Sequence, residues 1–141
     1  MESNAKPFHF HPYLVPVAHQ KVFKQELECL CEIGMLLHTG PLECLSPTFI
    51  IPKKDGRIHW VSDFHALNKV IKCKVYTLPR IQDILRKRSG YQFFTKLDTC
   101  MQYYTFQLDE HSKTLCTICT PFGNYHYNWL PMGVKQSPGI A

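Results

Sequence analysis

The stretch that decides the fold is Phe93-Phe94-Thr95-Lys96-Leu97-Asp98-Thr99-Cys100-Met101-Gln102-Tyr103-Tyr104. Its aromatic and apolar residues lead to one carboxylate, Asp98, and a second apolar-polar alternation follows through Phe106 and Leu108. This pattern predicts a strand buried on one face, with an acid at its C-terminal end. Such a carboxylate holds a metal ion, acts as an acid or base, or simply caps the turn after the strand. The local pattern alone favours the last of these roles, in which Asp98 caps the turn after the strand.

The bulk composition is that of a folded domain, or of part of a larger one. In 141 residues, 45% are hydrophobic and 13% aromatic, which predicts a packed core and excludes a disordered chain. There are 16 lysines and arginines against 11 acidic residues, a net charge of +5. This balance permits a phosphate-rich partner, but an ordinary slightly basic domain has it too.

Cysteine usage favours reduced thiols in an intracellular compartment. The count of 7 is odd, and the polar N-terminus is not followed by an apolar signal segment. Cys116 and Cys119 form a CxxC pair in a strand-like run, where residues three apart face opposite sides, and Cys29 and Cys31 do not share a helix face. Because no second pair completes a zinc site, these cysteines are predicted to be packing thiols. No apolar run reaches the ~18 residues of a membrane helix.

The expected architecture is α+β, with antiparallel strands and flanking helices. Residues 1–17 are expected to form an extended arm, whose His9 and His11 are not expected to bind a metal, and residues 18–141 the folded part. Apolar residues at helical spacing predict a helix over 19–35. Further helices are expected from 76 to 88 and from Ser137, and strands over 48–51, 58–61, 93–98, 114–120 and 124–129.

A basic hairpin is expected between the first two strands. Asp55-Gly56 is a strong hairpin signal between apolar runs. Lys53, Lys54 and Arg57 flank it, so the tip either contacts phosphates or is a solvated turn. The basic run at residues 86–88 has a structural explanation, because cations stabilise the C-terminal end of a helix.

Four blocks, in this order and spacing, resemble the reverse transcriptase of gypsy-type long-terminal-repeat retrotransposons. The similarity runs from about residue 12 to the end of the chain. The blocks are Ser46-Pro47-Thr48-Phe49-Ile50-Ile51-Pro52-Lys53-Lys54-Asp55-Gly56, Val61-Ser62-Asp63-Phe64 with Leu67-Asn68-Lys69, Phe94-Thr95-Lys96-Leu97-Asp98, and Leu130-Pro131-Met132-Gly133-Val134-Lys135-Gln136-Ser137-Pro138.

The resemblance implies the fingers and the front of the palm of a right-hand polymerase. In that family, palm carboxylates bind two Mg²⁺ ions that hold the triphosphate and activate the primer 3′-hydroxyl. Asp98 matches the first of these catalytic carboxylates, and the main-chain carbonyl of Thr99 matches a further metal ligand. The complete enzyme would act on an RNA or DNA template-primer and a dNTP, inside the cell in a cytoplasmic particle.

The resemblance also assigns nucleotide and nucleic-acid contacts. Lys53 matches the fingers lysine that reaches the triphosphate, and Tyr103 matches the aromatic gate against ribonucleotides, although an ordinary core tyrosine would look the same. Met132 and Gly133 match the turn that packs against the incoming nucleotide, and His59 and Thr99 occupy further positions expected to contact it. The expected nucleic-acid contacts are Lys54, Arg57 and, at the start of the helix under the template, Gln136, Ser137 and Pro138.

Two departures predict that the chain is inactive on its own. The family's paired aspartates would lie beyond Ala141, so one carboxylate is left for a two-metal site. His59 stands where the family usually carries an arginine that contacts the triphosphate, and a neutral imidazole cannot replace a permanently charged fork. The alternatives are a weak, sequence-independent nucleic-acid-binding module and a decayed retroelement remnant; His65, His126 and Trp129, at positions usually basic in relatives, favour decay.

Overall fold

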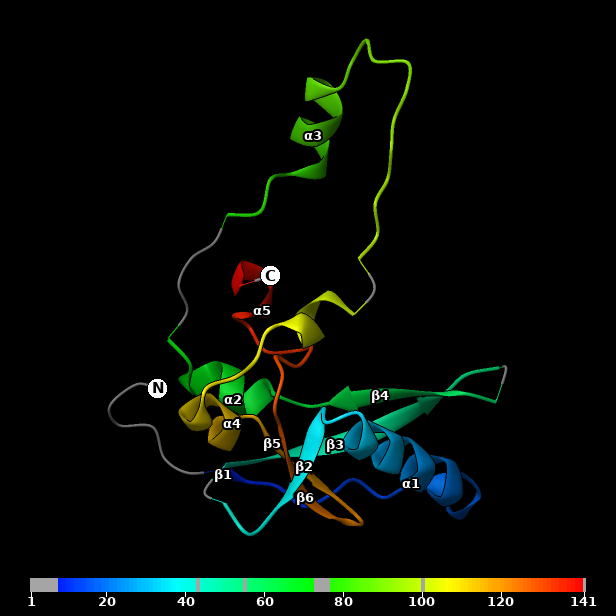
Figure 1. Ribbon diagram of the computed structural model, residues 1–141, viewed down its shortest axis with the longest axis vertical. Helices are drawn as coiled ribbons and strands as arrows, with labels where there is room; N and C mark the ends of the chain where they lie inside the picture. Colours follow the sequence, from blue (N-terminus) through cyan, green and yellow to red (C-terminus); the bar gives the residue numbers. More distant parts are fainter. Residues whose placement is uncertain (1–7, 43, 55, 73–76, 100, 141) are drawn as a thin grey trace.

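The computed structural model describes residues 8–42, 44–54, 56–72, 77–99 and 101–140 (Figure 1). Within these ranges the strands form a six-stranded sheet in the order β1-β3-β5-β6-β2, and β4 pairs with β3 outside this path. The strands are β1 (Phe8–His9), β2 (Leu36–Thr39), β3 (Cys44–Pro52), β4 (Ile58–Ser62), β5 (Thr117–Thr120) and β6 (Gly123–Tyr127).

The long strand β3 joins the sheet to a projecting hairpin. Its N-terminal half pairs in parallel with β1 and β5, and its C-terminal half pairs antiparallel with β4, from Thr48 opposite Ser62 to Pro52 opposite Ile58. The hairpin is thereby confirmed, as is the antiparallel β5–β6 pair. The parallel pairs β1–β3 and β3–β5 differ from the antiparallel arrangement that the sequence predicts. The two strands of each pair lie far apart in the sequence, so no local turn signal links them.

Several helices contact this sheet, and one projects away from it (Figure 1). They are α1 (Val17–Glu32), α2 (His65–Val70), α3 (Ile81–Lys87), the 3₁₀ turn η1 (Gln102–Thr105), α4 (Glu110–Leu115) and α5 (Ser137–Ile140). The helix predicted over 19–35 is confirmed as α1. It buries Phe23, Leu27 and Leu30, and the chain turns after it at Gly34, whose φ of 74° suits glycine. Ser137 begins α5 as predicted.

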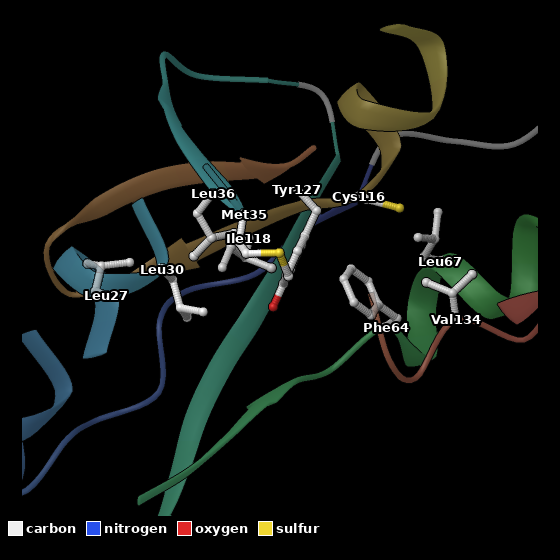
Figure 2. Close-up of a cluster of buried hydrophobic side chains, with 10 residues drawn as sticks. All are labelled: Leu27, Leu30, Met35, Leu36, Phe64, Leu67, Cys116, Ile118, Tyr127 and Val134. Carbon is white, nitrogen blue, oxygen red and sulfur yellow. The ribbon is translucent and has the colours of Figure 1, made fainter. Parts of the chain in front are cut away.

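The core lies between α1, the sheet and the segment around α2. Figure 2 shows Tyr127 of β6 between an aliphatic group that includes Leu30, Leu36 and Ile118 and a second group that includes Phe64 and Val134. The rings of Tyr127 and Phe64 lie 6.1 Å apart. Burying each of these side chains stabilises the fold by roughly 1.5–3 kcal/mol. Because Tyr127 lies between the two groups, it links them into one core.

The prediction of a strand over residues 93–98 is wrong. Residues 91–99 are in no strand, and together with α3 they project away from the rest of the molecule (Figure 1). Phe93 is 91% exposed and Leu97 is 89% exposed. An alternating apolar pattern becomes a strand only where a neighbour satisfies its backbone groups, and no described strand pairs with this segment.

Three further expectations are corrected. Thr114 and Leu115 belong to α4 and not to a strand, because the Asp109 side chain caps that helix by accepting a hydrogen bond of 2.6 Å from the Ser112 N–H. β6 ends at Tyr127, and only an isolated bridge from Gln107 continues the pairing to Trp129. Phe8 and His9 of the expected loose arm pair with β3.

Candidate functional site

The predicted phosphate-contacting cations lie at the exposed end of the β3–β4 hairpin. The Lys53 N–H donates to the Arg57 carbonyl at 2.7 Å, and Gly56, with φ of 82°, donates to the Lys53 carbonyl at 3.1 Å. These bonds close the turn, while the side chains of Lys53, Lys54 and Arg57 are exposed. Asp55, half of the hairpin signal, lies outside the described residues.

A cavity of about 270 Å³ opens between β4, α1, η1 and the turn at Met132. Three residues predicted to contact the nucleotide line it: His59 from β4, and Met132 and Gly133 from the turn. The fold thus brings together two sequence blocks that are far apart in the chain. The full lining is Glu26, Leu30, Ile58, His59, Trp60, Val61, Ser62, Met101, Tyr104, Tyr127, Met132 and Gly133.

Asn68 fixes the turn that carries Met132 and Gly133. Its side-chain amide donates to the Gly133 carbonyl at 2.8 Å, and its Oδ1 accepts from the Lys135 N–H at 2.7 Å. Gly133 has φ of 90°, and a Cβ there would lie 3.5 Å from the Ser62 carbonyl oxygen. The sequence placed Asn68 in a family block without a role; its role here is to position the turn.

A partly buried hydrogen-bond network forms the floor of the cavity. The Tyr127 hydroxyl lies 2.9 Å from Ser62 Oγ and accepts from Trp60 Nε1 at 3.1 Å. Trp60 also stacks on Phe23 of α1, with ring centroids 4.8 Å apart and planes 12° apart. Burial raises the pKa of the Tyr127 hydroxyl far above its usual range, so it stays protonated. No sequence signal marked this network, since its members come from distant strands.

Glu26 and Tyr104 meet at the cavity. Both line it, and the pKa of the Tyr104 hydroxyl is raised by burial and then by the negative charge of Glu26. Within the described part of the chain, the Glu26 carboxylate makes no hydrogen bond or ion pair. Neither residue stands out in the sequence, because Glu26 occupies an ordinary position on an amphipathic helix and Tyr104 belongs to an aromatic run.

Asp98 and Thr99 are not brought into this cavity. Both are exposed in the segment without secondary structure, and Asp98 forms no hydrogen bond or ion pair with another described residue. Tyr103 is half-buried in η1 beside Tyr104, but it does not line the cavity. Their predicted catalytic, metal-binding and gating roles stay predictions.

Met101 adopts a left-handed conformation, with φ of 53° and ψ of 35°, where the chain turns from this segment into η1. It is the one non-glycine residue with positive φ among those described. Backbone strain of this kind is held in place only where the surroundings determine it. Met101 itself lines the cavity together with Tyr104 of η1.

The residues expected under the template are held by intramolecular bonds. Ser137 is buried, and its hydroxyl donates to the Pro131 carbonyl at 3.0 Å, while the Gln136 amide donates to the Lys72 carbonyl at 2.8 Å. Pro138 is exposed. In this structure Gln136 and Ser137 shape the end of the Met132 turn, and their nucleic-acid contact stays a prediction.

The described residues show neither a metal cluster nor a membrane-spanning helix. They contain no group of three or more His, Cys, Asp and Glu side chains placed to hold a metal ion. No disulfide bond joins the described cysteines, and burial raises the pKa of the Cys116 thiol to about 12. No described helix has both the length and the apolar character required to cross a bilayer.

Comparison with known proteins gives two kinds of match. No family model matches the chain. Over 126 residues, or 89% of the chain, the sequence is 27% identical to the transposon Tf2-3 polyprotein of Schizosaccharomyces pombe, and the match spans 9% of that polyprotein. The Tf2-7 polyprotein of the same organism matches equally, at 27% identity over 126 residues.

Solved structures match over nearly the whole chain. A mutant of the prototype foamy virus protease-reverse transcriptase superposes with a TM-score of 0.84 at 21% identity, over 97% of this chain and 18% of that one. The foamy viral enzyme in complex with an RNA/DNA hybrid superposes with a TM-score of 0.78 at 18% identity, over 97% of this chain and 18% of that one. The chain therefore has the fold of a small part of these proteins.

Proposed function

We propose that this chain, which is homologous to the Tf2 retrotransposon polyproteins and folds like part of a retroviral reverse transcriptase, supplies a nucleotide-binding surface to RNA-templated DNA synthesis by a complete polyprotein. As a partial reverse transcriptase domain it contributes fingers and the front of the palm. On its own it does not polymerise.

The convergence of His59, Met132 and Gly133 around one cavity carries this proposal. The same strand pair places Lys53, Lys54 and Arg57 on the hairpin that continues from β4. Phosphoryl transfer depends on positioning and on charge stabilisation, and a basic hairpin next to a shaped pocket provides both. Lys53 binds the triphosphate in this proposal, and the Met132–Gly133 turn packs against the nucleotide.

The metal is the part that this chain does not provide alone. Mg²⁺ takes oxygen ligands in octahedral geometry and is held by one or two carboxylates together with substrate phosphates. The exposed, unpaired Asp98 carboxylate and the adjacent Thr99 carbonyl have the right chemistry for two ligands of a divalent metal. The described residues offer no further carboxylate beside them to complete a two-metal site. The other ligands are assigned to the remainder of the polyprotein.

Photo-cross-linking tests the nucleotide surface on the chain as it stands. With 4-thio-dTTP, labelling is expected on β4 and on the Met132–Gly133 turn, in competition with unlabelled dTTP. Lys53→Ala should reduce labelling several-fold, and Lys54→Ala, the neighbouring exposed lysine, serves as the matched control. Labelling that is spread evenly over the chain, or that Lys53→Ala leaves unchanged, would overturn the proposal.

A second candidate function is sequence-independent binding of single-stranded nucleic acid. A hollow of about 420 Å³ on the projecting segment is lined by Lys87, Arg88 and the rings of Tyr91, Phe93 and Phe94. Cations that track phosphates and rings that stack on bases are the two components of such binding. With the hairpin cations they predict an affinity that falls steeply with salt. Fluorescence anisotropy of a labelled oligonucleotide that stays flat from low to moderate salt would refute this candidate.

A further inference from the structure

We propose that the cavity beneath His59 and Met132 is a binding site for a small planar aromatic molecule that carries an amidinium or amino group, held by the Glu26 carboxylate. The site lies inside the same cavity whose exposed rim carries the proposed nucleotide contacts His59, Met132 and Gly133, and the phosphates of a nucleotide stay outside it, at the hairpin. The inference goes beyond the proposed function and does not depend on it.

The walls of the cavity select a flat apolar ring. Leu30 and Ile58 supply aliphatic surface, and Trp60, Tyr104 and Met132 add aromatic and thioether surface. Trp60 is held rigidly by its stack on Phe23. Pockets for small molecules combine such apolar walls with a few placed polar groups. An apolar protein cavity of about 150 Å³ accommodates benzene, so a cavity of about 270 Å³ has room for a substituted ring.

The floor offers no unsatisfied polar partner. Tyr127, Ser62 and Trp60 hydrogen-bond to one another, at 2.9 Å between the two hydroxyls and 3.1 Å from the indole nitrogen to the Tyr127 oxygen. A ligand therefore gains little by competing for these groups, and its ring rests on them. The polar end of the ligand has to be recognised elsewhere in the lining.

The Glu26 carboxylate recognises the polar end of the ligand, and its negative charge requires that this end be cationic or a hydrogen-bond donor. It is half-buried, lines the cavity, and has no hydrogen-bond or ion-pair partner in the described chain. Two residues along the same helix, and so on a different face from Glu26, Glu28 is paired with Lys24 at 3.9 Å. The other titratable groups facing the cavity are His59, Tyr104 and Tyr127. An unpaired carboxylate repels phosphate and attracts a cationic or donor group, and partial burial strengthens this attraction.

Benzamidine and its neutral analogue benzamide distinguish this site from alternatives. In a Trp129→Phe background Trp60 is the remaining tryptophan, and its fluorescence reports a ring that enters the cavity. Benzamidine is expected to quench this fluorescence with an affinity about tenfold higher than that of benzamide, as for one partly desolvated ion pair. Glu26→Gln should remove the difference, whereas Glu28→Gln, on the same helix, should keep it. Circular dichroism confirms that each variant is folded.

Three outcomes would overturn the inference. They are equal affinity for benzamidine and benzamide, an unchanged preference in Glu26→Gln, and displacement of benzamidine by tripolyphosphate. The last result would make the cavity a phosphate subsite and leave the proposed nucleotide function standing. Conversely, failure of 4-thio-dTTP labelling with intact benzamidine binding would remove the proposed function and leave this site.

Discussion

Replacing Tyr127 with phenylalanine removes one oxygen from the floor of the cavity and keeps the ring. Tyr127 is 2% exposed, and its hydroxyl bonds to Ser62 Oγ and to Trp60 Nε1. Two neutral hydrogen bonds contribute about 1 kcal/mol each. The indole N–H keeps a contact of 3.3 Å with Ser62 Oγ, so it is not left wholly unsatisfied. The free energy of unfolding should therefore fall by about 1–2 kcal/mol.

Urea denaturation followed by tryptophan fluorescence measures this loss. With a slope of roughly 2 kcal/mol per molar urea, the midpoint should move down by about 0.5–1 M. A Tyr127→Phe, Ser62→Ala cycle isolates the bond between the two hydroxyls, and the paired loss should be smaller than the sum of the single losses. Equal midpoints for Tyr127→Phe and the parent, or strictly additive losses, would show that the network does not hold the cavity floor.

Three further predictions concern the turns and caps around the site. Asn68→Ala should destabilise the fold by about 1–3 kcal/mol, and hydrogen exchange should speed up at the Lys135 amide; unchanged exchange there would refute the positioning role. Met101→Gly should be more stable than Met101→Ala by about 1 kcal/mol, the reverse of the usual order, because only glycine relieves a positive φ; Ala equal to or above Gly in urea titration would contradict it. The Ser112 hydrogen bond holds the pKa of Asp109 below its usual range, so the stability it contributes is present above the unfolded-state pKa and is lost as pH falls through the folded-state pKa. Asp109→Asn should therefore lose less stability than the parent on acidification below about pH 4, and identical acid titrations would refute the cap.

Local patterns in the sequence predicted what local physics decides. The spacing of Phe23, Leu27 and Leu30 located α1, and the turn residues between two apolar runs located the β3–β4 hairpin. The same reasoning failed for residues 93–98, because an alternating pattern forms a strand only when a neighbouring strand pairs with it, and the pattern itself does not show whether such a strand is present. It also missed the cap at Asp109, which begins a helix inside an apparently alternating run.

Only those residues of the site that match the family's sequence pattern could be predicted. Met132 and Gly133 were predicted from a family block and His59 from the family's usual arginine at its position, and the fold brings the three to one cavity. Trp60, Tyr127 and Glu26 were missed, since their roles arise from packing between β4, β6 and α1. Such contacts depend on strand register and helix placement, which no single stretch of sequence encodes.

The most direct test of the central claim is primer extension by a chimaera in which this chain replaces the matching 126 residues of the Tf2-3 polyprotein. The account predicts RNA-templated dNTP incorporation that Asp98→Asn abolishes. His59→Arg should increase it, because a guanidinium offers the triphosphate a permanent charge and a bidentate set of donors that an imidazole lacks. Two results would contradict the account. One is a folded chimaera that incorporates no dNTP in an assay where the parent polyprotein is active, and the other is a chimaera that still incorporates dNTPs after Asp98→Asn.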